Sequence, residues 1–406
     1  METDPIKRQF ERWVYPPPVD DLSQIDFNAP QNHFLDVRRA PWNFWPATGL
    51  HEDIDILVAG CGTTAGPCFA HCYPRAHVVG IDISEPSLAC ARRLKDRHNF
   101  HNLTLMKLPV EQAHTLGASF DLVAVHGVLH HLPDPVAGMA SLGRTLKPDG
   151  VISCMLYGKY GRLGVYMFQE LFRLLGLGHE PQDVQVVKQA VHLIGPLHPL
   201  KTYLASAADL PADAAFVDTF LSGRDRPYTV PEVLDLVERA GLAFAGWDEN
   251  ALYSLDAMAA HAEPLKSRIG ALPEARQWEA VELLFGRIAG HFFHVCRKDR
   301  DPALWQHRVD TDAFLEYTPI PRITQVQADP ATRLPTAIAR PPFPPVPLDA
   351  GQSRLLAQVD SRRNVRQCIE SAGVPADSAR AFLRFLWNIG YIMLRMPHPS
   401  GTLRGF

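Results

Sequence analysis

Five short apolar runs between residues 53 and 157 constrain the fold of this chain more than any other feature. The runs are IDILVAG, HVVGIDI, LTLMKL, FDLVAVHG and GVISCML, and helix-like stretches separate them. A parallel strand is covered on both faces, so it needs continuous Val, Ile and Leu rather than alternating polar residues. Strands that alternate with helices predict a doubly wound, Rossmann-like α/β domain.

A glycine-rich turn follows the first run. Gly60, Cys61 and Gly62 lie there, and a helical stretch begins a few residues later. Glycine allows a tight turn and lets a ligand approach the backbone without meeting a Cβ. Asp82 lies in the second run, where a carboxylate can accept both hydroxyl protons of a ribose. Capping of the next helix is the alternative role for Asp82, because Ser-Glu-Pro follows closely.

Three later motifs narrow the function. They are FDLV at 120–123, GVLHHLPDP at 127–135 and LKPDG at 146–150. With them, residues 53–157 resemble class I S-adenosylmethionine-dependent methyltransferases. The resemblance implies S-adenosylmethionine as the cofactor, a methyltransferase activity, and an acid that holds the ribose.

By that resemblance, each cofactor contact maps onto a residue of this chain. The loop residues Gly60, Cys61 and Gly62 pass under the methionine end, and Asp82 binds the ribose. The family usually has an acid immediately before the first loop glycine, whereas this chain has Ala59. The remaining contacts are Ile83, Val110 and Glu111 around the adenine, and His126 under the methionine moiety.

Candidate catalytic residues follow the fourth and fifth runs. Methyl transfer from a sulfonium is an in-line displacement, so the enzyme mainly aligns the acceptor and excludes water. Histidine suits the role of a base because its pKa lies near neutrality. The candidates are His131 and His130, then Tyr157 and Tyr160, with packing as their alternative role. Arg162 can bind a substrate carboxylate or pair with one on the protein.

The pattern along the chain predicts five parts. RQFERWVYP at 8–16 resembles the N-terminal lid of some bacterial methyltransferases, and the last 50 or so residues resemble the regulatory domain of bacterial protein-lysine methyltransferases. Prolines crowd the stretch before that domain and favour a linker. The parts are a lid segment (1–50), the cofactor-binding α/β core (51–158), a mostly helical region for substrate binding or dimerisation (159–329), a proline-rich linker (330–348) and a helical C-terminal domain (349–406).

Composition limits the partners. The chain has 406 residues, of which 46% are hydrophobic, and a net charge of -4, so it lacks the overall basic character of a nucleic-acid-binding protein. Seven cysteines are too sparse for a disulfide framework and predict reduced thiols. The start has no apolar signal region, and no apolar run is long enough to span a membrane. We therefore expect a cytoplasmic protein that binds neither a metal nor a membrane.

Several alternatives stay open at this point. The methyl acceptor is a protein side chain or a small molecule, and a homodimer is possible. An NAD(P)-dependent oxidoreductase uses a similar glycine turn. A non-catalytic protein that retains the fold and binds S-adenosylmethionine is a second alternative, which Ala59 favours.

Overall fold

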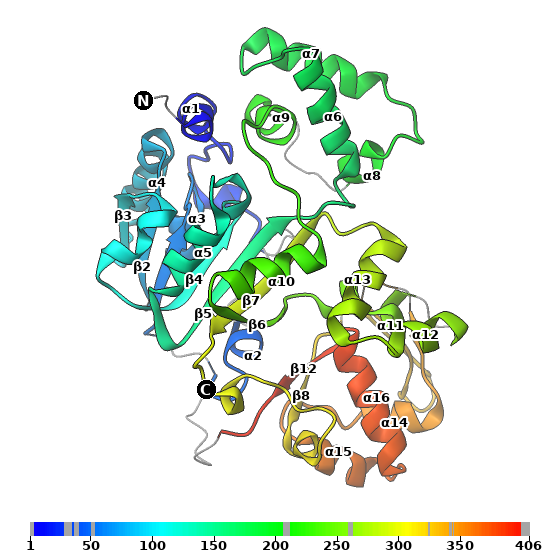
Figure 1. Cartoon of the computed structure of the whole chain (residues 1–406). Helices are drawn as coiled ribbons and strands as arrows, with labels where there is room; N and C mark the ends of the chain where they lie inside the picture. Colours follow the sequence, from blue (N-terminus) through cyan, green and yellow to red (C-terminus); the bar gives the residue numbers. More distant parts are fainter. Residues whose placement is uncertain are drawn as a thin grey trace. The chain divides into compact units, whose positions relative to one another are not determined.

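The computed structural model describes residues 4–27, 35, 40–49, 53–205, 212–258, 263–323, 325–340, 343 and 345–398 (Figure 1). The chain divides into two compact units, each discontinuous in sequence. The first unit comprises Met1–Val37, His51–Phe244 and Phe285–Asp299. The second comprises Arg38–Leu50, Ala245–Leu284 and Arg300–Phe406. Each unit consists of three separate segments of the chain, whereas each of the five parts named above is one continuous segment. The five parts therefore stay a prediction.

A seven-stranded sheet organises the first unit, with the order β3-β2-β1-β4-β5-β7-β6. The five apolar runs form β1 to β5, which pair in parallel. β7 then pairs antiparallel with β5. This is the Rossmann-like methyltransferase architecture that the sequence predicts. The strands are β1 (Asp55–Ala59), β2 (His77–Asp82), β3 (Leu103–Lys107), β4 (Phe120–His126), β5 (Leu146–Tyr157), β6 (Leu242–Trp247) and β7 (Gly290–Arg297).

The strands β6 and β7 lie among the helices of residues 159–329, the region that the sequence predicts to be mostly helical. Their sequences, LAFAGW and GHFFHVCR, carry the aromatic and β-branched residues that fit a strand. Short apolar runs of this length do not distinguish a strand from a buried helix by periodicity. Pairing with β5 decides the matter, because it supplies hydrogen-bond partners for the backbone of β7.

Helices surround the sheet and extend beyond it. Two stretches with amphipathic apolar spacing form α6 and α10, and α10 begins with a capping box between Thr229 and Glu232. The helices of the first unit are α1 (Pro5–Arg12), α3 (Ala65–Cys72), α4 (Glu85–His98), α5 (Pro135–Gly143), α6 (Leu163–Leu174), α7 (Pro181–Leu193), α8 (Leu200–Leu204), α9 (Asp213–Phe220) and α10 (Val230–Arg239). Short 3-10 helices are η1 (Leu22–Gln24), η3 (Val110–Leu116) and η4 (Leu129–His131).

A separate apolar cluster holds α6, α7, α8 and α9 together, and Figure 1 shows these helices grouped beyond the sheet. Phe168 and Phe172 of α6 meet Phe220 of α9 at ring-centroid distances of 6.0 and 6.3 Å. Buried apolar area of this kind is what fixes short helices in place. The residues that follow β5 and those near Phe220 are therefore held in one body within the first unit.

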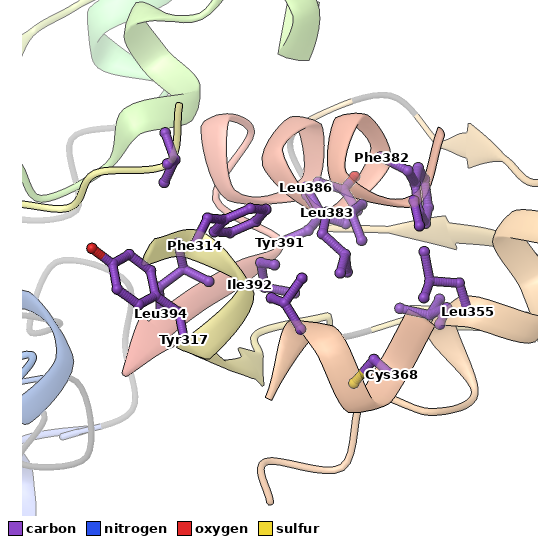
Figure 2. Packing of buried hydrophobic residues seen from close by; sticks show 14 of the residues in the cluster. Phe314, Tyr317, Leu355, Cys368, Phe382, Leu383, Leu386, Tyr391, Ile392 and Leu394 are labelled. Carbon is purple, nitrogen blue, oxygen red and sulfur yellow. The ribbon is translucent and has the colours of Figure 1, made fainter. Parts of the chain in front are cut away.

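The second unit has its own core of buried apolar residues, part of which Figure 2 shows. Leu383 and Leu386 of α16 and Cys368 of α15 are fully buried there. Its helices are α2 (Ala40–Phe44), α11 (Leu255–Met258), α12 (Glu263–Gly270), α13 (Glu274–Phe285), α14 (Ala350–Leu356), α15 (Val365–Ala372) and α16 (Ala376–Asn388), with 3-10 helices η5 (Asn250–Tyr253), η6 (Pro302–Leu304) and η7 (Asp312–Glu316).

The second unit also contains strands that the sequence did not predict. β12 (Ile392–Arg395) pairs antiparallel with β8 (Thr318–Pro321). A three-stranded sheet has the order β11-β10-β9, with β9 at Gln325–Ala328, β10 at Pro335–Ala339 and β11 at Val346–Pro347. The stretch predicted as a linker thus contributes two strands. Pro335 is tolerated because it is the first residue of its strand, at a shift in register.

Candidate active site

The parallel register brings four predicted site segments to one edge of the sheet. Ala59 pairs with Ile81, and His126 pairs with Met155, so β1, β2, β4 and β5 end at similar heights. Ligands of open α/β sheets bind outside these carboxyl ends. The glycine loop, Asp82, His126 and Tyr157 consequently lie at the same edge of the sheet.

The glycine loop has the backbone shape that its sequence requires. Gly60 and Gly62 have φ angles of +70° and +54°, a region that residues with a Cβ rarely adopt. A Cβ on Gly60 would lie 2.3 Å from the Cγ2 atom of Val128. The amides of Gly60 and Cys61 both donate to the Ile81 carbonyl, at 2.8 and 2.9 Å. The loop is therefore fixed against β2 and presents backbone rather than side chains.

Asp82 lies at the end of β2, beside this loop. Its carboxylate accepts hydrogen bonds from the Gly62 and Ser84 amides, each at 2.8 Å. Ser84, not Asp82, caps α4, because the Ser84 hydroxyl accepts from the Ser87 amide. Burial raises the pKa of Asp82 above its ordinary value, while the backbone N–H donors act in the opposite direction. The carboxylate is thus not committed to the helix and is oriented by the glycine loop.

The residues predicted around the adenine follow β2 and β3. Asp82 pairs with Lys107 in the sheet, and the Leu108 amide donates to the Asp82 carbonyl at 3.0 Å. Ile83 is half-buried after β2, and η3 begins at the buried Val110 with the half-buried Glu111 next. The structure therefore brings these three residues to the Asp82 side of this edge of the sheet.

Two residues expected near the methionine end have ordinary partners. His126 ends β4, and its Nε2 atom lies 3.0 Å from the Ser153 hydroxyl of β5. Cys61 is fully buried against Gly80 of β2, and burial raises the pKa of its thiol well above the usual value. A neutral, buried thiol of this kind packs under the loop and does not act as a nucleophile.

The N-terminal segment lies over the glycine loop. The Thr63 hydroxyl donates to the Pro16 carbonyl at 2.9 Å, and the Ser84 hydroxyl donates to the Phe10 carbonyl at 3.1 Å. A Cβ on Gly62 would lie 3.2 Å from the Cδ atom of Pro16. This is the placement that a lid over the loop requires, and it concerns residues 4–27 of the predicted segment 1–50.

The other face of α1 contacts the helical part of the first unit. The Trp13 indole donates to the His179 carbonyl at 2.9 Å, and Arg12 forms an exposed ion pair with Glu180. Gln9 is buried, and its side chain accepts from the Gly223 amide at 3.0 Å. The helix α1 therefore connects Ser84, which follows β2, with the segment that follows α9.

The two candidate histidines lie together with Tyr157. The His130 ring centroid is 4.1 Å from that of Tyr157 and 4.3 Å from that of His131. His130 is fully buried, and burial lowers its pKa well below the usual value. His131 is anchored by a 2.6 Å hydrogen bond between its Nδ1 atom and the Arg224 carbonyl. The carbonyl can only accept, so Nδ1 is the donor in this hydrogen bond.

Arg162 pairs with a carboxylate of the protein, the second of its two predicted roles. The side chains of Arg162 and Asp225 are 2% and 1% exposed, and their charged atoms are 3.3 Å apart. The guanidinium also lies 3.6 Å from the Tyr157 ring centroid and donates to the Tyr203 hydroxyl at 2.9 Å. Gln169 donates to Asp225 at 2.9 Å. This charge pair is compensated within the fold.

Tyr160, the fourth candidate catalytic residue, lies beside Lys159 and Gly286. The ammonium of Lys159 lies 5.9 Å from its ring centroid, and its Cβ is 4.0 Å from where a Cβ on Gly286 would be. His130, His131 and Tyr157 form the group of ring contacts described above, and Tyr160 belongs to none of them. Its catalytic role stays a prediction.

Sequence reasoning missed Asp218 on α9. Asp218 is 3% exposed and receives a 3.4 Å hydrogen bond from the Gln9 amide. Burial raises its pKa, and the neighbouring Asp225 adds to the increase. A carboxylate in the apolar helix DAAFVDTF was the available signal, because such a residue is rarely buried without a role.

Within the described ranges, no group of three or more His, Cys, Asp or Glu side chains is placed to hold a metal ion. No helix within those ranges has the length and apolarity needed to cross a membrane. All seven cysteines, which the structure describes, are free thiols.

Comparisons with known proteins identify relatives of this chain. Residues 57–152 match the family model of a methyltransferase domain. An uncharacterized protein of Synechococcus is 26% identical over 78% of this chain and 76% of its own length. A ubiquinone biosynthesis O-methyltransferase of Acinetobacter baumannii is 32% identical, over 29% of this chain and 49% of that protein.

A solved structure shows the same fold over almost the whole chain. PKMT2 from Rickettsia typhi matches with a TM-score of 0.62 and 14% identity, covering 94% of this chain and 77% of that one. Its complex with AdoHcy matches with a TM-score of 0.61 and 16% identity, over 95% and 78% of the two chains. The domain match favours methyl transfer over the dinucleotide alternative. This chain carries a class I S-adenosylmethionine-dependent methyltransferase domain.

Proposed function

We propose that the chain transfers a methyl group from S-adenosylmethionine to an acceptor bound at the carboxyl edge of β4 and β5. The observation that carries this proposal is the Asp82 carboxylate, oriented by the Gly62 amide beside a loop that has no Cβ at either glycine. Such a loop accepts a ligand against its backbone, and the adjacent carboxylate accepts ribose hydroxyls. The residues present therefore fit this cofactor.

The position of each residue along the edge of the sheet suggests which part of S-adenosylmethionine it contacts. The backbone of Gly60, Cys61 and Gly62 supports the methionine end, with His126 beneath it. Asp82 holds the ribose. Ala59 offers no charge for the methionine ammonium, so backbone carbonyls or a lid residue supply that contact. The adenine lies among Ile83, Val110 and Glu111.

The acceptor side lies next to His131 and Tyr157. When bound, S-adenosylmethionine supplies a methyl group activated by a sulfonium. The protein aligns the acceptor with that group and excludes water. The N-terminal segment is placed for the second task, because Pro16 contacts Thr63 of the loop and Phe10 contacts Ser84 beside it. His130, being buried and neutral, positions Tyr157 by packing.

The acceptor is a protein side chain or a small molecule. The net charge of -4 disfavours a nucleic acid. Seven free thiols suit the reducing cytoplasm, which we propose as the location. A homodimer also stays a proposal, and sedimentation of the full chain tests it.

Isothermal titration tests the cofactor assignment. The full chain should bind S-adenosylhomocysteine and not NADH. Asp82→Asn should weaken binding by about 1–3 kcal/mol, the usual cost of leaving buried polar groups without their partners. Asp96→Asn is the matched control, because Asp96 is an exposed carboxylate on the helix after Asp82. Equal affinities of the two variants would assign the ribose to another residue.

A further inference from the structure

The helix α6 has two apolar faces, and the described residues cover only one of them. Its inner face packs into the cluster with α7, α8 and α9, and the residues Val165, Phe168 and Phe172 are buried there. Residues three or four positions apart share one face of a helix, and this spacing connects a second set of apolar residues on the outer side. We call this second set the outer stripe. Its members are between 38% and 77% exposed, and they are Leu163, Met167, Leu171 and Leu174.

The outer stripe differs from the solvent side of an ordinary surface helix. Such a helix buries one apolar stripe and turns its charged residues toward water. On α6, the 3.6-residue turn places the charged residues Glu170 and Arg173 on one flank instead, between the inner face and the outer stripe. A contiguous apolar patch on a surface marks a place where another surface binds. The outer stripe therefore indicates a partner.

The apolar surface extends beyond α6 on the flank away from the two charges. The segment between α7 and α8 packs there, because the His198 ring centroid lies 5.2 Å from that of Phe168 and a Cβ on Gly164 would meet the Leu200 backbone. Leu197 of this segment is 97% exposed. A helix of 12 residues is about 18 Å long, so one row of its side chains covers only part of the roughly 800 Å² that each copy buries in a stable dimer. Leu197 brings the patch closer to that area.

The charged flank of α6 is complementary to itself. Glu170 and Arg173 lie one helical turn apart and form an ion pair within the helix. In two antiparallel copies of α6 related by a two-fold axis beside Leu171, the order of the charges is reversed, so each Glu170 lies opposite the Arg173 of the other copy. In a parallel pair, the charged flanks lie on opposite sides of the contact and do not meet. Charge therefore favours a second copy of this chain, bound antiparallel.

A lipid surface fits the outer stripe less well. A helix that lies on a membrane is rich in Lys and Arg on its polar face, which bind anionic lipids. The charged flank of α6 has one acid and one base, so its charges cancel. The opposite face of the helix is already buried in the cluster with α7, α8 and α9.

We propose that the chain forms a two-fold symmetric homodimer in which the outer stripes of two antiparallel α6 helices pack together, with reciprocal Glu170–Arg173 ion pairs at the rim. This contact gives the homodimer an interface and does not depend on the identity of the methyl acceptor. Rim charges add little affinity and mainly fix the orientation, so the stripe supplies the affinity. Arg162, at the start of α6, lies beside the acceptor side. The antiparallel pairing places the two acceptor sides at opposite ends of the contact, so each copy keeps its own site.

Sedimentation of the full chain over a dilution series tests the outer stripe. Interfaces of standard size have dissociation constants of about 1 μM or below, so the wild type should sediment as a dimer at about 10 μM. Leu174→Glu should raise the dissociation constant at least about 100-fold, because it places two carboxylates in an apolar contact. Leu283→Glu is the matched control. Leu283 is also an exposed leucine, but it lies on α13, so this variant should sediment as the wild type does.

A mixture of two charge variants tests the antiparallel arrangement. Glu170→Arg has two cations on the flank and Arg173→Glu has two anions, so each variant alone should dimerise more weakly than the wild type. An equimolar mixture should form a heterodimer about tenfold tighter than either homodimer, because opposite charges then meet across the contact. A mixture that associates no more tightly than the separate variants would contradict the antiparallel arrangement. Both substitutions are at exposed positions, so this test holds even if Leu174→Glu fails to fold.

Three results would overturn the homodimer. The first is a wild type that sediments as a monomer at about 10 μM. The second is a dimer whose dissociation constant changes less than about threefold in Leu174→Glu. The third is a monomeric wild type that binds phosphatidylcholine vesicles and loses this binding in Leu174→Glu, which would assign the stripe to a lipid surface.

Titration with S-adenosylhomocysteine separates this proposal from the proposed function. The monomeric Leu174→Glu variant should bind it as tightly as the wild type does, because the contact takes no residue from the cofactor side. A wild-type dimer that does not bind S-adenosylhomocysteine would refute the proposed function alone. A wild-type monomer that binds it would refute the homodimer alone.

Discussion

The substitution Gly60→Ala tests whether the glycine loop has the conformation described above, because the structure leaves no room for a side chain at this position. An L-residue in the left-handed region costs about 1–2 kcal/mol. At Gly60 the new Cβ would also lie 2.3 Å from the Cγ2 atom of Val128, well inside van der Waals contact. Overpacking of this kind typically costs about 1–3 kcal/mol. We therefore expect a total loss of about 2–5 kcal/mol in the free energy of unfolding.

Gly117→Ala is the matched control for the backbone cost. Gly117 has a φ of +62°, close to the +70° of Gly60, but a Cβ there meets nothing within 4 Å. This variant should lose only the left-handed cost of about 1–2 kcal/mol. The difference between the two variants then reports the contact with Val128 alone.

Urea unfolding of the variants, combined with Val128→Ala, completes the test. The double variant Gly60→Ala/Val128→Ala should recover most of the overpacking cost, since the clashing Cγ atoms are gone. Binding of S-adenosylhomocysteine should weaken in Gly60→Ala and not in Gly117→Ala. Equal losses of unfolding free energy in the two alanine variants, or no recovery in the double variant, would refute the placement of the loop.

Two further predictions concern charge. Since burial holds the pKa of Asp82 above its unfolded value, its carboxylate costs stability at neutral pH, and this cost disappears as the pH falls below the unfolded pKa. Binding of S-adenosylhomocysteine needs the charged form, so its dissociation constant should rise as the pH falls through the folded pKa, and Asp82→Asn should abolish that dependence in calorimetric titrations. Separately, Arg162→Leu should lower the free energy of unfolding by about 3–5 kcal/mol, because it leaves Asp225 buried and uncompensated, whereas Arg162→Leu/Asp225→Leu should recover most of the loss. A double variant no more stable than the single one would contradict this account of the pair.

The sequence predicts the residues on the cofactor side of the site well, because each of them lies in or directly after a strand that its own apolar residues indicate. Each of β1 to β5 is a continuous apolar run, and the glycine loop and Asp82 follow such runs directly. The parallel register then brings the ends of neighbouring strands together without further information. Asp82 and Gly62 therefore meet although 20 residues separate them.

The acceptor side is less predictable because its partners are distant in sequence. Gln9 reaches Asp218 across 209 residues, and Arg162 reaches Asp225 across 63. No periodicity encodes such contacts, since they depend on how α1, α6 and α9 pack. The strands β7 and β10 were missed for a related reason. β7 exists by pairing with β5, and the proline-bearing β10 by pairing with β9.

A crystal structure of the full chain with S-adenosylhomocysteine tests the central claim most directly. The account predicts both ribose hydroxyl oxygens within about 2.5–3.0 Å of the Asp82 carboxylate, with the methionine end over Gly60 and Gly62. A ligand bound elsewhere, or one whose ribose contacts a different acid, would contradict it.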